Sequence, residues 1–154
     1  MRAAITFDLD MTTLPKPYLN RNPRTVPNRI WDQVIRRDLA RVDRIYGPDS
    51  HRAGLLMALE KRDIADARRH GALSLGGGIA GPVRWGSIFI WGGTASVTCR
   101  ATGWAKSEGY HNGHKFIYGP RNMADYTFTL GKHHGRWLVT DERFTFVPGY
   151  GGNP

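Results

Sequence analysis

Residues 122–147 predict a β-hairpin whose second strand changes phase. Apolar and polar residues alternate over residues 124–130, as in a half-buried strand, and residues 131–135 then turn the chain. The apolar residues of the second strand fall in two phases, first Trp137 and Val139, then Phe144 and Phe146. Because one extra residue exchanges the two faces of a strand, we expect a bulge or sharp bend near residues 141–143.

Residues 28–46 have the apolar period of an amphipathic helix. The stripe consists of Trp31, Val34, Ile35, Leu39, Val42 and Ile45. At 100° per residue, Asp38 falls near the centre of that stripe. A carboxylate that faces a core costs several kcal/mol unless it is paired, hydrogen-bonded or open to a polar cavity. Asp38 is therefore expected to be either a ligand-pocket residue or a buried structural anchor.

The first 26 residues predict an extended, proline-rich arm. Residues 3–9 have weak strand character, and the prolines that follow keep the chain out of a helix. We expect this arm to be dispensable for folding and needed for assembly. It contains Asp8, Asp10 and Thr12 in the spacing of the nucleophile motif of haloacid-dehalogenase-type phosphatases. That chemistry needs a parallel α/β sheet, which the rest of the sequence does not predict.

Short elements are expected between the long helix and the first strand. Gly47 and Pro48 end the long helix, and a second helix follows over residues 50–59. Asp63 caps a short third helix that ends near Gly71. The glycine-rich residues 71–82 predict a flexible connection rather than a phosphate-binding loop, because no Gly-Lys-Ser/Thr follows.

Residues 84–91 predict a strand that is apolar on both faces. Its large apolar residues are Trp85, Ile88, Phe89, Ile90 and Trp91. The predicted helices cover only one face of a single sheet. We therefore expect another subunit or the N-terminal arm to cover the second face, with these residues as an interface.

The next segment alternates as a strand over residues 94–106, and residues 107–120 predict a polar loop. The single cysteine, Cys99, excludes an internal disulfide and a multi-cysteine metal site, and its place within a strand predicts a core residue. His111 and His114 lack the acidic or thiol neighbours of a metal site apart from Glu108. The sequence thus predicts no metal site and no cofactor.

The chain carries 22 Lys+Arg against 13 Asp+Glu, a formal net charge of +9. This excess favours acidic partners, including nucleic acid, or serves solubility; no nucleic-acid-binding signature accompanies it, and the basic residues are scattered. No signal peptide or membrane-spanning segment is apparent, so a cytoplasmic location is expected.

The order of helices and strands resembles the nuclear-transport-factor-2-like (NTF2-like) superfamily, which includes SnoaL-type and VirB8-type domains. Residues 134–139, His-Gly-Arg-Trp-Leu-Val, look like the Gly-x-Trp-x-Ile/Val opening of the last strand in these domains. The resemblance covers about residues 28–147. It implies an α+β, cone-like fold in which a long helix and short helices pack on a curved antiparallel sheet. The expected organisation is an extended arm (1–26), the NTF2-like domain (27–148) and a glycine-rich tail (149–154).

The resemblance implies two classes of function. A SnoaL-like isomerase, cyclase, dehydratase or hydrolase would use Asp38 as general acid or base and Tyr126 to polarise a small hydrophobic substrate. A non-catalytic assembly module of a conjugation, secretion or virion complex would fill the cone with side chains and use the sheet face and the arm to hold subunits together. The arm and the two-sided strand favour assembly, with a homo-oligomer or larger complex as partner, whereas the isolated Asp38 favours catalysis.

Overall fold

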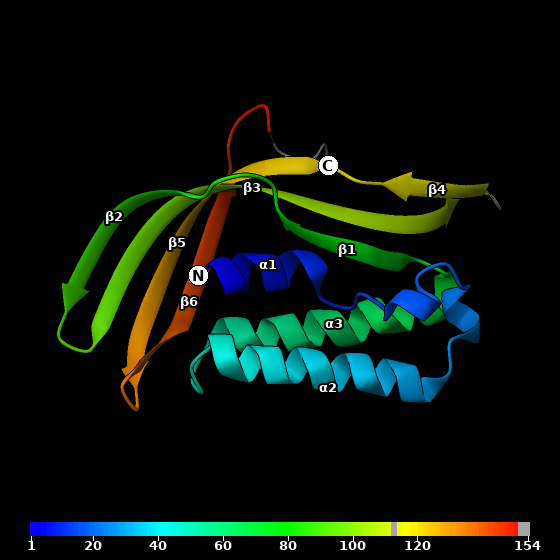
Figure 1. Ribbon diagram of the computed structural model, residues 1–154, viewed down its shortest axis with the longest axis horizontal. Helices are drawn as coiled ribbons and strands as arrows, with labels where there is room; N and C mark the ends of the chain where they lie inside the picture. Colours follow the sequence, from blue (N-terminus) through cyan, green and yellow to red (C-terminus); the bar gives the residue numbers. More distant parts are fainter. Residues whose placement is uncertain (112–113, 151–154) are drawn as a thin grey trace.

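The computed structural model describes residues 1–111 and 114–150. Within them, three α-helices lie on one side of a six-stranded antiparallel sheet, which confirms the predicted α+β class (Figure 1). The helices are α1 (Arg2–Asp10), α2 (Asn28–Ile45) and α3 (His51–His70), and two short 3-10 turns (Lys16–Tyr18 and Pro23–Thr25) join α1 to α2. The strands are β1 (Leu73–Ile79), β2 (Arg84–Trp91), β3 (Thr94–His111), β4 (His114–Tyr118), β5 (Arg121–His133) and β6 (Arg136–Phe146). None of the helices described is both long and apolar enough to cross a membrane.

The long strand β3 organises the sheet, whose main order is β1-β3-β5-β6. On one edge, β3 pairs with β2 near its start and with β1 farther along. On the other edge, it pairs with β5 and then with β4. Figure 1 shows β2 and the adjoining ends of β3, β5 and β6 curving away at one end of the molecule, while β1 lies over the helices. Among the described residues, β2 therefore has a sheet neighbour, β3, on one side only.

The predicted phase change in the last hairpin is present as a bulge. The β5–β6 register passes from Thr129 opposite Asp141 to Leu130 opposite Val139, so Thr140 is the extra residue. It lies one residue before the predicted segment. The hairpin turn is shorter than predicted, because only His134 and Gly135 separate the strands. Both have positive φ, 48° and 80°, as a two-residue hairpin turn requires.

The prediction of an extended N-terminal arm is wrong for residues 2–10, which form α1. Ala4, Ile5 and Phe7 are fully buried in the main hydrophobic core. This helix has nine residues, fewer than a helix needs to be stable alone in water. Its stability must therefore come from packing between the sheet and the other helices, which local sequence patterns do not show.

Three other segments are more regular than predicted. One helix of 20 residues, α3, replaces the two short ones. The glycine-rich segment contains strand β1. At Gly77, a Cβ atom would lie 2.0 Å from the carbonyl oxygen of Leu9, so only glycine lets α1 approach this strand. Strand β4 occupies part of the predicted polar loop. In the predicted tail, residues 151–154 lie outside the described part of the chain.

The buried apolar residues form two clusters. The larger lies between the sheet, α1 and the inner faces of α2 and α3, and it includes Cys99, as predicted. The smaller includes Trp31, Val34 and Ile64. Leu39, assigned to the apolar stripe of α2, is exposed instead.

Candidate functional site

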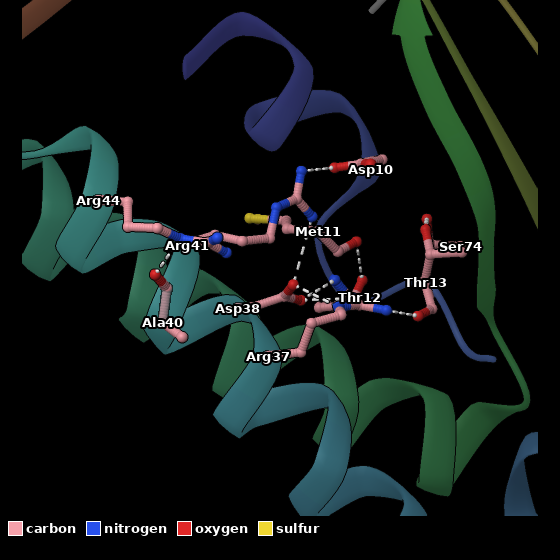
Figure 2. A network of polar contacts seen from close by, with 10 residues as sticks. All are labelled: Asp10, Met11, Thr12, Thr13, Arg37, Asp38, Ala40, Arg41, Arg44 and Ser74. Atoms are coloured by element: carbon pink, nitrogen blue, oxygen red, sulfur yellow. Dashed lines mark hydrogen bonds and ion pairs between the residues drawn. The ribbon is translucent and has the colours of Figure 1, made fainter. Parts of the chain in front are cut away.

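Asp38 lies at the centre of a partly buried ion-pair network (Figure 2). Its side chain is 0% exposed, which confirms that it faces the interior. Its Oδ1 accepts hydrogen bonds from Arg37 Nε at 2.7 Å and Arg41 Nη1 at 3.3 Å. Its Oδ2 accepts from Arg37 Nη2 at 2.8 Å and from the backbone N–H of Thr12 at 3.1 Å. These are the contacts of a structural anchor that joins α2 to the segment after α1.

A second acid, Glu60 on α3, is buried beside Asp38. Neither Glu60 oxygen accepts a hydrogen bond from the described residues. Burial, followed by the negative charge of Asp38, raises the pKa of Glu60 to about 8. A neutral Glu60 carries a proton that it can donate to Asp38. The sequence analysis missed Glu60, because nothing in the α3 pattern marks this position as fully enclosed.

Another polar cluster lies under the sheet between α1, α3 and β6. Asp8 forms an ion pair with Arg52. The Tyr46 hydroxyl donates to Glu142 Oε2 at 2.9 Å. Asp8 Oδ1 and Glu142 Oε1 are buried and have no hydrogen-bond partner among the described residues. Burial, and next the charge of Asp8, raise the pKa of Glu142 to about 7, and burial also raises the pKa of Tyr46.

This second cluster borders a cavity of about 230 Å³. Its polar lining residues are Asp8, Arg52, Asn122 and Tyr126, and its apolar wall includes Leu56, Leu59, Phe144 and Phe146. Tyr126 stacks with Phe128 at a centroid distance of 5.9 Å, and burial raises its pKa to about 12. Asp38 does not line this cavity, so the two residues proposed for catalysis from the sequence do not share it.

The two aspartates of the phosphatase-like motif, Asp8 and Asp10, each form an ion pair with an arginine. Asp8 and Asp10 lie on α1, and Asp10 pairs with Arg41 at 2.7 Å. Neither lies at the end of a parallel strand, where that chemistry needs them. Among the described residues, no group of three His, Cys, Asp or Glu side chains is placed to hold a metal ion.

All eight residues of β2 are exposed. We call its five large apolar side chains the β2 surface; they are Trp85 (48% exposed), Ile88 (59%), Phe89 (69%), Ile90 (67%) and Trp91 (90%). Ile88 and Ile90 pair with the buried Val97 and Ala95 on the helix side of the sheet, whereas Phe89 and Trp91 point to the outer side. A register shift after Trp85 places it on the same side as the isoleucines.

The β2 surface is thus apolar on both faces, as predicted, and uncovered in the described chain. The N-terminal segment does not cover it, because α1 packs against β1 and β3. The expectation that the N-terminal arm covers the second face of residues 84–91 is therefore wrong.

No family model matches the chain, and no curated protein sequence matches it. Among solved structures, it is similar to the intermembrane space region of the chloroplast protein ARC6, with 9% identity and a TM-score of 0.48 over 71% of this chain and 78% of that one. It is also similar to an NTF2-like protein with a cystatin-like fold from Novosphingobium aromaticivorans, with 15% identity and a TM-score of 0.34 over 63% of this chain and 55% of that one. A designed NTF2 protein is similar with 15% identity and a TM-score of 0.32 over 73% of this chain and 88% of that one.

Two of these three structures are named as NTF2-like or NTF2 proteins. The arrangement of helices on one side of an antiparallel sheet is the α+β architecture that the resemblance implies.

Proposed function

We propose that this protein is a non-catalytic assembly module that binds a second copy of itself through the β2 surface. The single observation that carries the proposal is an edge strand whose eight residues are all exposed and whose large side chains are apolar on both faces. Soluble monomers rarely expose apolar patches larger than a few hundred Å².

The area of the β2 surface suits a stable interface. Each of its side chains exposes roughly 100–200 Å², so together they expose on the order of 600 Å² per chain. A standard interface buries about 800 Å² per partner. Burial of the β2 surface would therefore supply most of one interface, and the neighbouring strand ends would supply the rest.

The backbone of β2 supports the same conclusion. In the described part of the chain β2 pairs with β3 alone, so its outer edge has unpaired N–H and C=O groups, which are a template for pairing with another strand. Neither a lysine nor a proline, two common means of blocking an edge, interrupts residues 84–91. Antiparallel pairing of β2 with β2 of a second copy would extend the sheet and bury apolar residues on both faces.

Sedimentation of matched variants tests this proposal. Changing Phe89 and Ile90 together to Thr keeps β-propensity and removes apolar area, so it should convert the associated wild type to monomer. Ile117→Thr is the control, because Ile117 is also an exposed apolar strand residue (56%), on β4 at the other end of the sheet. A wild type that sediments as a monomer at high concentration would refute the proposal, and so would association that survives the double change.

A second candidate function, a SnoaL-like enzyme, has one observation in its favour. The cavity beside Tyr126 has a carboxylate, Asp8, in its wall, and burial raises the pKa of Asp8, as general acid-base catalysis often requires. The acid of such an enzyme would be Asp8 rather than Asp38. However, α1 is part of the core beneath the sheet, and the cavity volume of about 230 Å³ is less than the roughly 300–1,000 Å³ of ordinary ligand sites.

Thermal melts with a panel of small hydrophobic carbonyl compounds test the second candidate. A compound that raises the melting midpoint of the wild type, and raises it less for Asp8→Asn, would favour the enzyme. The absence of any shift would favour the assembly module.

A further inference from the structure

The outer face of the sheet, opposite the helices, contains a basic groove. Along β3, Ala101 is buried on the helix side, and the side chains of Thr102 and Trp104 alternate to the outer side. The groove has a volume of about 790 Å³. It is lined by Ala80, Gly81, Thr102, Trp104, Lys106, Gly119 and Arg121, together with Ala105.

Glycines of β1 leave room for this groove. Gly76 and Gly78 lie opposite Lys106 and Trp104, so they share the outer face and carry no side chains to fill it. A Cβ atom at Gly78 would lie 3.4 Å from the indole Nε1 of Trp104, which means that the indole lies close over this strand. Trp104 is still 38% exposed. The glycine segment, predicted to be a flexible connection, thus forms the floor beneath an accessible aromatic ring.

A second hollow of about 110 Å³ shares Ala80 and Thr102 with the groove and adds Arg84 and Arg100 to its lining. No acidic residue is among the residues that line either hollow. Asp125 lies next to them and is bound to Arg100, at 2.6 and 2.8 Å. The groove and the hollow therefore form a continuous surface with a net positive charge.

Two of these cations face each other directly. Arg84 and Arg100 are opposite residues of the β2–β3 pair. Like charges at opposite positions of a sheet are destabilising. Asp125 offsets one of them, so one positive charge is left that an anion would compensate.

We propose that the groove and the adjoining hollow together bind single-stranded nucleic acid without sequence preference. The phosphates contact Arg84, Lys106 and Arg121, and an unstacked base lies on Trp104. The combination of a positively charged track with an exposed aromatic ring is how proteins bind single strands. A duplex offers phosphates but keeps its bases stacked inside, so it cannot use the tryptophan. An acidic peptide would use the charges and would gain little from a flat indole.

Fluorescence anisotropy with a labelled oligothymidine tests the proposal on the intact protein. Trp104→Ala should weaken binding by about tenfold, the lower part of the range for loss of one stacked base. Trp137→Ala is the matched control, since Trp137 is 40% exposed on β6 and lies outside the groove; this variant should bind like the wild type. Lys106→Gln and Arg121→Gln should each reduce the slope of log K against log salt by about 0.7.

Three results would overturn the proposal. The first is no binding of the oligothymidine at low salt. The second is equal binding by the Trp104→Ala and Trp137→Ala variants, which would show that charge alone is responsible. The third is competition by an acidic peptide or heparin at least as strong as that by an unlabelled oligonucleotide. An unchanged melting midpoint for each variant ensures that lost binding is not lost folding.

Discussion

Glu60 should make the protein less stable as the pH rises, and Glu60→Gln should remove this effect. Burial and the adjacent Asp38 raise the pKa of Glu60 in the folded chain to about 8, whereas an ordinary glutamate titrates near 4.5. Between these pH values the folded chain holds a proton that the unfolded chain has released. The resulting stabilisation is complete below pH 4.5 and is lost as the pH rises through 8.

The magnitude follows from the size of the shift. Each pKa unit corresponds to about 1.4 kcal/mol, so the full shift sets an upper limit of about 5 kcal/mol. Arg37 also faces this site and lowers the pKa of Glu60, whereas Asp63 on α3 raises it. We expect a loss of about 3 kcal/mol between pH 5 and pH 8, or roughly 10 °C in the melting midpoint for a domain of this size.

Thermal melts of three proteins across this pH range provide the assay. Glu60→Gln keeps the shape and a donor for Asp38 at every pH, so its midpoint should fall less and should exceed that of the wild type at pH 8. Asp43→Asn, an exposed change on α2, should follow the wild-type profile. If wild type and Glu60→Gln have the same pH profile, or if the glutamine variant is the less stable at pH 8, then Glu60 is not a buried neutral acid and the reasoning fails.

Three further predictions concern the same interior. Asp38→Asn should lower the free energy of unfolding by about 2–4 kcal/mol in thermal melts, because it leaves two partly exposed arginines without their carboxylate; an unchanged midpoint would contradict the anchor role. Phe7→Ala should cost about 3–5 kcal/mol by denaturant unfolding, because this ring is fully buried, whereas Leu39→Ala on the exposed side of α2 should cost less than 1 kcal/mol. Tyr46→Phe removes the hydroxyl that lowers the pKa of Glu142, so it should destabilise by about 1–3 kcal/mol at pH 8 and by less at pH 5; an equal loss at both pH values would contradict it.

Features that depend on the local spacing of apolar and polar residues were predictable from the sequence. The alternation of the last hairpin predicted two paired strands, and its change of phase predicted the bulge to within one residue of Thr140. The helical period of residues 28–45 placed Asp38 inside. Periodicity reports which side of an element is buried, and each of these conclusions needed only that information.

Features that depend on distant contacts were not predictable. Helix α1 has a short, weakly patterned sequence, and its burial depends on a space left by the sheet and by α3. The close approach of Leu9 to Gly77 explains why residue 77 is a glycine, but nothing in the local sequence indicates that approach. The pairing of Asp8 with Arg52 likewise joins segments that only the fold brings together.

Amide hydrogen exchange of the wild type at low and high protein concentration tests the central claim most directly. If β2 pairs with β2 of a second copy, the exchange of its outward-facing amides should slow as the concentration rises to about 100 µM, whereas exchange in β4 should stay the same. Association without any added protection of residues 84–91 would contradict the proposed interface.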